Sequence, residues 1–343
     1  MLLQFANIRI FFRKPVELFA ASGVQHEGMF RFFPDILHQK NLLPKTLTPF
    51  TMRYSINDLE KLTGIKAHTL RIWEKRYAII SPRRTDTNIR YYDNEDLKQL
   101  LNISTLNRHG FKISRIAKMS GEEIRDKVME ISASSADYDS QINKLVVAMI
   151  DLNEAGFEQT LGNSILKIGF EKTVTHVLYP LLEKIGILWQ IGTINPAQEH
   201  FLTNLIRQKM IIAIDGQQQT TSEKAKTFLL FLPENELHEL GLLFYHYLIK
   251  KNGFKSIYLG QSVPFNDLVE VTRIRHADYL FTYFVAAMNH KQAARYIEQL
   301  SAAFPKKTIF VTGLQLQDSA EGLPANAVLV KNAEEFKQQL NIG

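Results

Sequence analysis

The 343-residue chain contains no cysteine, and it has no long apolar run. The first absence excludes disulfides, thiolate metal sites, iron–sulfur clusters and cysteine nucleophiles. The second argues against a membrane partner, because the longest candidate run, 279–288, falls well short of the roughly 18 residues of a membrane span. We therefore expect a cytoplasmic protein. With 45% apolar and 22% charged residues, the chain has an ordinary globular composition and is long enough for two or three domains.

The positive charge is concentrated in one segment. Residues 53–120 contain 14 Lys and Arg against 7 Asp and Glu, whereas residues 121–343 contain 21 against 25. A basic segment on a near-neutral body suggests a nucleic-acid-binding head. On charge alone, a solvated basic surface without a partner explains the asymmetry equally well.

Residues 1–52 form a poorly defined N-terminal extension. They hold 8 of the 22 phenylalanines without a sustained period, and Arg9, Arg13 and Lys14 interrupt the apolar residues. A signal peptide needs its charges before an uninterrupted apolar stretch, so the order is wrong for one. Met52 directly precedes the first clear helix pattern. Our hypothesis is that residues 1–51 are not made in the cell, and a loosely packed arm is the alternative.

The head, residues 53–120, is expected to consist of short helices. Ser55 and Asp58 have the spacing of a capping box, Gly64 ends the first helix, and Asp93 caps a later one. The expected helices and the hairpin loop between them cover 55–62, 67–77, 81–92 (the loop), 93–107 and 114–119.

The middle of the chain is predicted to be a helical bundle between two linkers. Residues 121–140 include the run ISASSADYDS and are expected to be a linker, and the polar run at 215–226 is a second. Between them, over 141–214, apolar residues recur at helical spacing, which indicates a four-helix bundle.

After residue 226 the period changes. Short apolar runs alternate with helical segments, which is typical of a parallel sheet. The chain as a whole is therefore expected to be multidomain, α and α/β, with a flavodoxin-like doubly wound domain over 227–343. The predicted strands cover 227–232, 256–260, 278–283, 308–313 and 327–330.

The segment INDLEKLTGIKAHTLRIWEKRYAIISPRRTDTNIRYYDNEDL (56–97) resembles the winged helix–turn–helix of the MerR family of transcription regulators. The resemblance implies a duplex DNA operator as partner, with the helix at 67–77 in the major groove. Trp73 is expected to pack in the core of the head. The candidates for reading base edges are His68, Thr69 and Arg71. The candidates for phosphate contacts are the wing arginines Arg83, Arg84 and Arg90. Arg76 and Tyr91 are further candidate DNA contacts.

The variant RIWEKRY is similar to the MerR branch that includes CarH-type cobalamin photoreceptors. Other sensors of the family extend a long dimerisation helix after the head, but here a Ser/Ala linker is reached by Ser132. The chain contains Trp189 followed, after nine intervening residues, by Glu199-His200. This spacing resembles the W-x(9)-E-H motif of the helical bundle that caps the upper face of adenosylcobalamin in this branch. Its photoreceptors carry a cobalt-capturing histidine directly after the tryptophan, where this chain has Gln190.

Glu236, His238 and Gly241 resemble the D/E-x-H-x-x-G motif of base-off, His-on cobalamin domains. The resemblance makes His238 the lower axial cobalt ligand, and Glu236 is suited to orient its ring. Ser262 follows the second predicted strand and is another candidate contact.

Two further elements of these cobalamin domains, S/T-x-L and Gly-Gly, contribute to the pocket for the nucleotide tail. Thr282-Tyr-Phe284 matches the first after 40 intervening residues, and Thr312-Gly313 matches the second after 27 more. Phe284 replaces Leu and Thr312 replaces Gly. These departures weaken the match for the tail pocket and leave His238 unaffected.

The resemblance implies a transcription regulator, expected to be a repressor and not an enzyme. In the family, adenosylcobalamin assembles a DNA-binding homo-oligomer through the effector domains, and light breaks the cobalt–carbon bond and ends repression. Two alternatives keep the same fold: a cobalamin sensor without a light response, and a regulator that acts through protein partners without cobalamin. A corrinoid methyl-transfer protein is disfavoured, because no length remains for a substrate barrel of about 250 residues.

Overall fold

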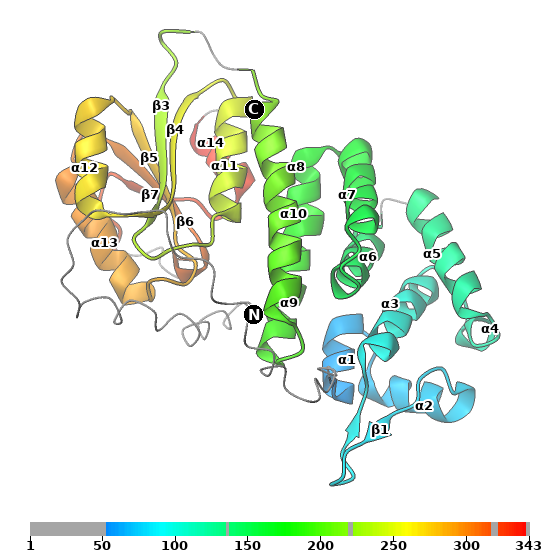
Figure 1. The fold of residues 1–343 in the computed structure, drawn as a ribbon. Helices are drawn as coiled ribbons and strands as arrows, with labels where there is room; N and C mark the ends of the chain where they lie inside the picture. The colour runs from blue at the N-terminus through cyan, green and yellow to red at the C-terminus, as the bar shows by residue number, and fades with distance from the viewer. Residues whose placement is uncertain (1–52, 135–136, 219–221, 317–321, 341–343) are drawn as a thin grey trace, which may run out of the picture.

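The computed structural model describes residues 53–134, 137–218, 222–316 and 322–340. The extension expected at 1–52 lies outside these residues. The described chain forms a head, a helical bundle and an α/β domain, in that order (Figure 1). Within it, no helix is long and apolar enough to cross a membrane.

The head consists of short helices and a two-stranded wing, as the sequence predicts. Ser55 and Asp58 form a reciprocal capping box, and Gly64 ends the first helix at φ +74°. Asp93 caps the third helix with a second capping box. Trp73 is buried, as expected. The elements are α1 (Ile56–Thr63), α2 (Ala67–Tyr77), the antiparallel strands β1 (Arg83–Arg84) and β2 (Arg90–Tyr91), α3 (Asn94–Arg108), α4 (Ile113–Ile116) and α5 (Gly121–Ser134).

The prediction of a linker over 121–140 is wrong for most of that segment. Residues 121–134 form α5, and the next helix begins at Tyr138. Ser120 and Glu123 form a capping box, in which the side chain of each accepts a hydrogen bond from the backbone N–H of the other. Ile124 and Val128 are buried one turn apart. Because α5 packs against α3, tertiary burial stabilises a helix in a stretch whose Ser and Ala content favoured a linker.

The middle of the chain is a four-helix bundle, as predicted. Its third helix is one continuous run that contains a π-helical turn, η3. The elements are α6 (Tyr138–Ile150), α7 (Glu154–Ile168), the run α8 (Phe170–Thr173), η3 (Val174–Leu178) and α9 (Tyr179–Gln190), and α10 (Pro196–Asp215).

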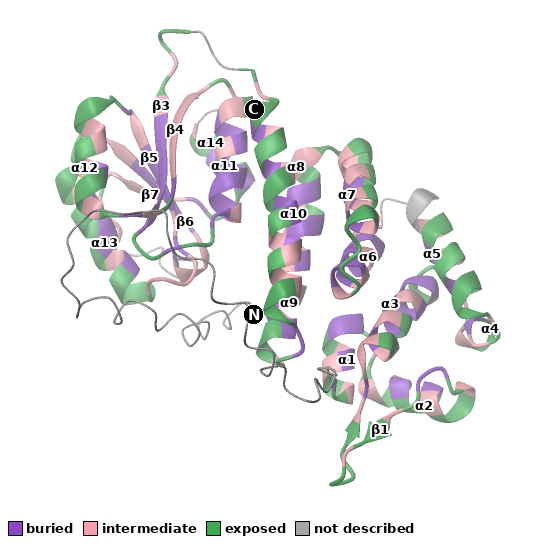
Figure 2. Ribbon diagram, viewed as in Figure 1, coloured by how far each residue is buried: buried purple, intermediate pink, exposed green. Residues whose placement is uncertain are grey.

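The C-terminal domain is a parallel five-stranded sheet with strand order β4-β3-β5-β6-β7. This is the flavodoxin-like order, which places ligands at the carboxyl ends of the strands. Helices cover both faces, and the central strands β3, β5 and β6 are largely buried, whereas the edge strands β4 and β7 are mostly half-buried (Figure 2). The elements are β3 (Thr227–Pro233), α11 (Leu240–Lys251), β4 (Lys255–Val263), α12 (Phe265–Ile274), β5 (Tyr279–Tyr283), α13 (His290–Ala303), β6 (Thr308–Thr312), the 3₁₀ turn η4 (Leu314–Leu316), β7 (Ala327–Leu329) and α14 (Ala333–Gln339).

Packing between helices joins the three parts. Helix α10 lies along α11 (Figure 1), and an ion pair between Arg207 and Glu239 joins them. On the other side of the bundle, α3 of the head packs on α6. The carboxyl edge of the sheet therefore lies beside the helix that carries Glu199 and His200.

Candidate DNA-reading head and cofactor site

Helix α2 presents a basic face to solvent. His68 and Arg71 are exposed on it, and Thr69 is half-buried. Ile72 is 47% exposed and Lys75 is exposed as well. Because residues 68, 71, 72 and 75 follow helical spacing, they form one continuous face. Ile72 and Lys75 were not among the residues expected to contact DNA, although helical spacing places both on the face of His68 and Arg71; an exposed apolar side chain there would suit the methyl group of thymine.

The arginines of the wing are exposed and held by neighbouring polar groups. Arg83 pairs with Asp93, the cap of α3, and Arg84 donates to Asn88 Oδ1 at 2.7 Å. Arg90 lies 3.8 Å from Glu74 of α2. Tyr91 is half-buried under the guanidinium group of Arg53. The wing extends away from the bundle (Figure 1), so these cations are accessible to phosphates.

The loop between β3 and α11 holds His238 by a buried carboxylate. His238 donates from Nδ1 to Glu236 Oε1 at 2.6 Å, and its backbone N–H donates to the same oxygen. Glu236 Oε2 accepts from the backbone N–H groups of Val285, Ala286 and Ala287. The His238 side chain is 46% exposed. With Nδ1 engaged, Nε2 is the nitrogen that can ligate a metal.

Glu236 is ionised in this arrangement. Burial alone would raise its pKa, but the hydrogen bonds from His238 and from the backbone of Ala287 and Ala286 outweigh burial and lower the pKa to about 2. A depressed pKa stabilises the folded state above the unfolded value and loses that contribution as pH falls toward 2.

We expect Glu236→Gln to lower the free energy of unfolding by about 3 kcal/mol at pH 7, and by progressively less between pH 4.5 and 3. Urea unfolding at several pH values measures the difference. Glu298→Gln, at an exposed position of α13, is the control. A wild-type advantage over Glu236→Gln that stays constant from pH 7 to pH 3 would contradict the assignment.

The cap residues lie at the end of α9 and the start of α10. Trp189 is 39% exposed, and the side chain of His200 is 63% exposed, 3.9 Å from Glu199. His200 and Arg207 are seven residues apart, so they share one face of α10 about 10 Å apart along its axis. Arg207 contacts Glu239, the residue after His238. His200 therefore lies beyond the carboxyl edge of the sheet, on the side of α10 that faces this loop.

The remaining candidates occupy several positions at the same edge. The hydroxyl of Ser262 accepts from the backbone N–H of Asn235 and so supports the His238 loop. Gly241 lies in the first turn of α11, against Tyr283. Thr282 is fully buried, and its hydroxyl has no hydrogen-bond partner among the described residues. Gly313 follows β6 at φ +120°.

His246, on α11 two turns after His238, faces the protein interior rather than the site. It is half-buried, bonds through Nε2 to Ser256 at 2.9 Å and stacks on Tyr258. Burial lowers its pKa to about 4.

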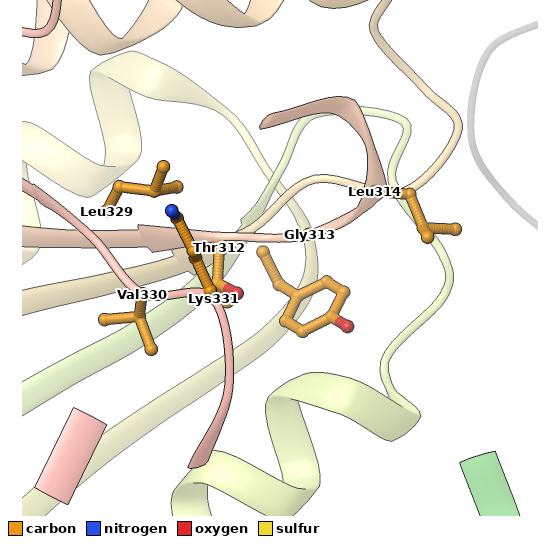
Figure 3. Close-up of a pocket in the computed structure, with 7 residues that line it drawn as sticks. Thr312, Gly313, Leu314, Leu329, Val330 and Lys331 are labelled. Carbon is orange, nitrogen blue, oxygen red and sulfur yellow. The ribbon is translucent and has the colours of Figure 1, made fainter. Parts of the chain in front are cut away.

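These residues fit one part of a cobalamin and not another. The oriented His238 and the exposed cap side chains suit the lower and upper faces of a corrin ring. The tail elements enclose a cavity of only about 40 Å³, lined by Tyr283, Thr312–Leu314 and Leu329–Lys331 (Figure 3). Ligand sites usually measure 300–1,000 Å³, so the nucleotide tail does not fit there.

Residues 54–122 match the MerR HTH family of regulatory proteins, and residues 141–214 match the B12 binding domain family. The HTH-type transcriptional repressor CarH of Myxococcus xanthus is 26% identical over 259 residues, which cover 74% of this chain and 86% of that protein. The repressor CarA of the same organism is 26% identical over 300 residues, covering 82% and 99%. Among solved structures, the monomethylamine corrinoid protein of Methanosarcina barkeri is 19% identical with a TM-score of 0.47, covering 58% and 96%.

Proposed function

Because the chain is a MerR-type helix–turn–helix regulator with a B12-binding domain, we propose that it is a transcriptional repressor whose DNA binding is controlled by adenosylcobalamin. The proposal extends to assembly as a homo-oligomer through the effector domains and to a response to light. A regulator of this kind acts on DNA in the cytoplasm and performs no catalysis. The full-length relatives CarH and CarA carry the name of transcriptional repressors, which supports this choice over an enzyme.

The observation that carries the proposal is the Glu236–His238 pair beside α10. Its Nδ1 hydrogen bond of 2.6 Å fixes the ring, and we assign His238 as the lower cobalt ligand. Trp189, Glu199 and His200 would cover the upper face, the indole as an apolar lid and the other two as polar contacts. When bound, adenosylcobalamin supplies a cobalt–carbon bond that light can cleave.

Polar contacts link the cap to the reading head. Lys184, five residues before Trp189, donates to Asn143 Oδ1 at 2.7 Å. Asn143 in turn donates to Thr105 of α3 at 3.2 Å. Burial lowers the pKa of Lys184 to about 8. A shift of α9 on ligand binding would therefore move groups that contact the head, which is a route for coupling the two sites.

A second link joins the same regions. Thr193, in the turn between α9 and α10, lies close to the side chain of Tyr54 of the head. Gln198 of α10 donates to the Ile150 carbonyl at 2.9 Å, and Lys98 of α3 pairs with the adjacent Asp151 at 2.7 Å. These contacts support a head whose position depends on the cap.

We expect illumination of the loaded protein to leave no stable bis-imidazole spectrum. Residue 190 is glutamine, and an amide is a poor cobalt ligand beside an imidazole. His176 lies 13 residues before Trp189 on one helical run, about 20 Å away along the axis. Among the described residues, His200 is the remaining candidate, in the second turn of α10 and eleven positions after Trp189. Absorption spectra before and after illumination, with gel filtration of the same samples, measure the ligation and the assembly state.

Gln190→His is the matched variant, because it restores an imidazole next to Trp189 and should give a lasting bis-imidazole spectrum. A bis-imidazole spectrum in the wild type that disappears in His200→Ala would show that His200 captures cobalt. No spectral change under light would favour the second candidate, a cobalamin sensor without a light response. Purified protein that takes up no corrinoid would favour a regulator that acts through protein partners.

A further inference from the structure

The tail elements of the α/β domain meet in close contact. A Cβ atom added to Gly241 would lie 2.6 Å from the ring of Tyr283, and one added to Gly313 would lie 2.1 Å from the carbonyl oxygen of Phe284. Both distances are far below a van der Waals contact. The first turn of α11 and the ends of β5 and β6 are therefore closed against each other. We call the region where they meet the tail slot; it is formed by Gly241, Tyr283, Thr312 and Gly313.

Tyr283 is the residue that fills the tail slot. Side chains alternate along β5: Leu280 and Phe284 belong to the core cluster that includes residues of α12 and α13, and Phe281 and Tyr283 pack in the cluster that includes α11 and α14. Thr282 has the parity of Leu280 and Phe284. Tyr283, the bulky middle residue of the Thr-Tyr-Phe element, is therefore the one that lies against Gly241.

Neighbouring aromatic rings hold Tyr283 in place. Its ring centroid lies 6.2 Å from that of Tyr245, which packs on Phe281 at 4.6 Å and on Phe336 at 5.3 Å. The side chain of Tyr245 also lies close to Thr312, the residue that stands where a glycine was expected. One departure from the cobalamin pattern, Thr312, thus lies beside Tyr245, and the ring of Tyr245 supports Tyr283.

The space left over is small. The cavity at the ends of β5, β6 and β7 measures about 40 Å³ (Figure 3). A cavity needs roughly 10–15 Å³ of such space to hold one water, so this one has room for only a few waters. A benzimidazole nucleotide needs a pocket of several hundred cubic ångströms.

We propose that this protein recognises its corrinoid by the ring alone, and that Tyr283 keeps the nucleotide tail out of the α/β domain. The ligand class is accordingly wider than cobalamin: it includes incomplete corrinoids that lack the nucleotide. This inference rests on the proposed function, since it assumes that His238 and the cap bind the ring. His238 ligation requires free cobalamin to release its own benzimidazole from the lower face. A tail-less corrinoid has no base to release.

Titrating the full chain with hydroxocobalamin and with diaquocobinamide, followed by absorption spectroscopy, tests the proposal. The wild type should bind cobinamide at least as tightly as cobalamin. Tyr283→Gly opens the tail slot and should gain at least tenfold in the ratio of cobalamin to cobinamide affinity. Tyr283→Phe keeps the ring and is the matched control, with the wild-type ratio. Circular dichroism checks that each variant folds.

The outcomes separate this inference from the proposed function. A wild type that binds cobalamin at least tenfold more tightly than cobinamide would overturn the inference alone, because the tail would then contribute and Tyr283 would have to move. Binding of neither probe, with no spectral change that depends on His238, would overturn the proposed function itself. The wild-type comparison decides the question even where Tyr283→Gly does not fold.

Discussion

Replacing His238 with alanine is expected to weaken cobalamin binding by at least tenfold and to shift the corrin spectrum to the base-off form. The reason is that Glu236 occupies Nδ1 and leaves Nε2 for the metal. Altering groups that only orient a metal ligand costs 10–100-fold in affinity, so loss of the ligand itself should cost at least as much. Absorption titration with hydroxocobalamin measures both effects.

His246→Ala is the matched control for this experiment. His246 is the next histidine along the chain, and its Nε2 is engaged with Ser256. We expect the variant to bind as the wild type does. A His238→Ala protein with an unchanged spectrum and affinity would mean that another residue ligates cobalt from below. Glu236→Gln should give an intermediate loss, because it keeps the size of the side chain but removes the charge that fixes the ring.

Neutralising the wing should weaken binding to all duplexes alike. Arg83→Gln with Arg84→Gln removes two cations that are exposed on the wing. Each cation that no longer neutralises a phosphate reduces the steepness of log K against log salt by about 0.9, so the double variant should reduce it by about 1.8. Fluorescence anisotropy over a series of salt concentrations measures this slope. The titrations use a random duplex and the duplex that binds most tightly in a selection from a random pool.

Arg71→Ala should behave differently, because Arg71 lies on the exposed face of α2 and the wing arginines do not. We expect it to cost about 1–3 kcal/mol on the selected duplex and to change the sequence preference. Arg273→Ala, on α12 far from the head in the chain, is the control. Unchanged DNA binding after all three head substitutions would contradict the assignment of residues 54–122 as the reading head.

The features that local chemistry dictates could be predicted from the sequence. The start and end of α1 and the start of α3 follow from the capping residues Ser55 and Asp93 and from Gly64, which act within a few positions. The strands could be found because buried parallel strands are short continuous apolar runs. The Glu236–His238 pair is also local, since only Leu237 separates the two residues in the chain.

The errors come from burial between distant segments. The Ser120–Glu123 capping box and the spacing of Ile124 and Val128 were present in the sequence, yet what stabilises α5 is its packing on α3. The position of Tyr283 over Gly241 depends on the register of β5 beside β6 and on Tyr245 of α11 and Phe336 of α14, which lie 38 and 53 residues from Tyr283 in the chain. Motif spacing predicts the order of the tail elements but not whether their side chains leave room for a ligand.

The central claim is that one bound corrinoid controls DNA binding by the head. The measurement that tests it most directly is the dissociation constant for one selected duplex, determined without cofactor, with adenosylcobalamin in the dark, and after illumination of the same sample. Coupling between two sites commonly amounts to 5–150-fold. We predict binding at least fivefold tighter with adenosylcobalamin in the dark, and a return toward the cofactor-free value after light. Equal dissociation constants in all three states, in a protein that demonstrably holds the corrinoid, would contradict the account.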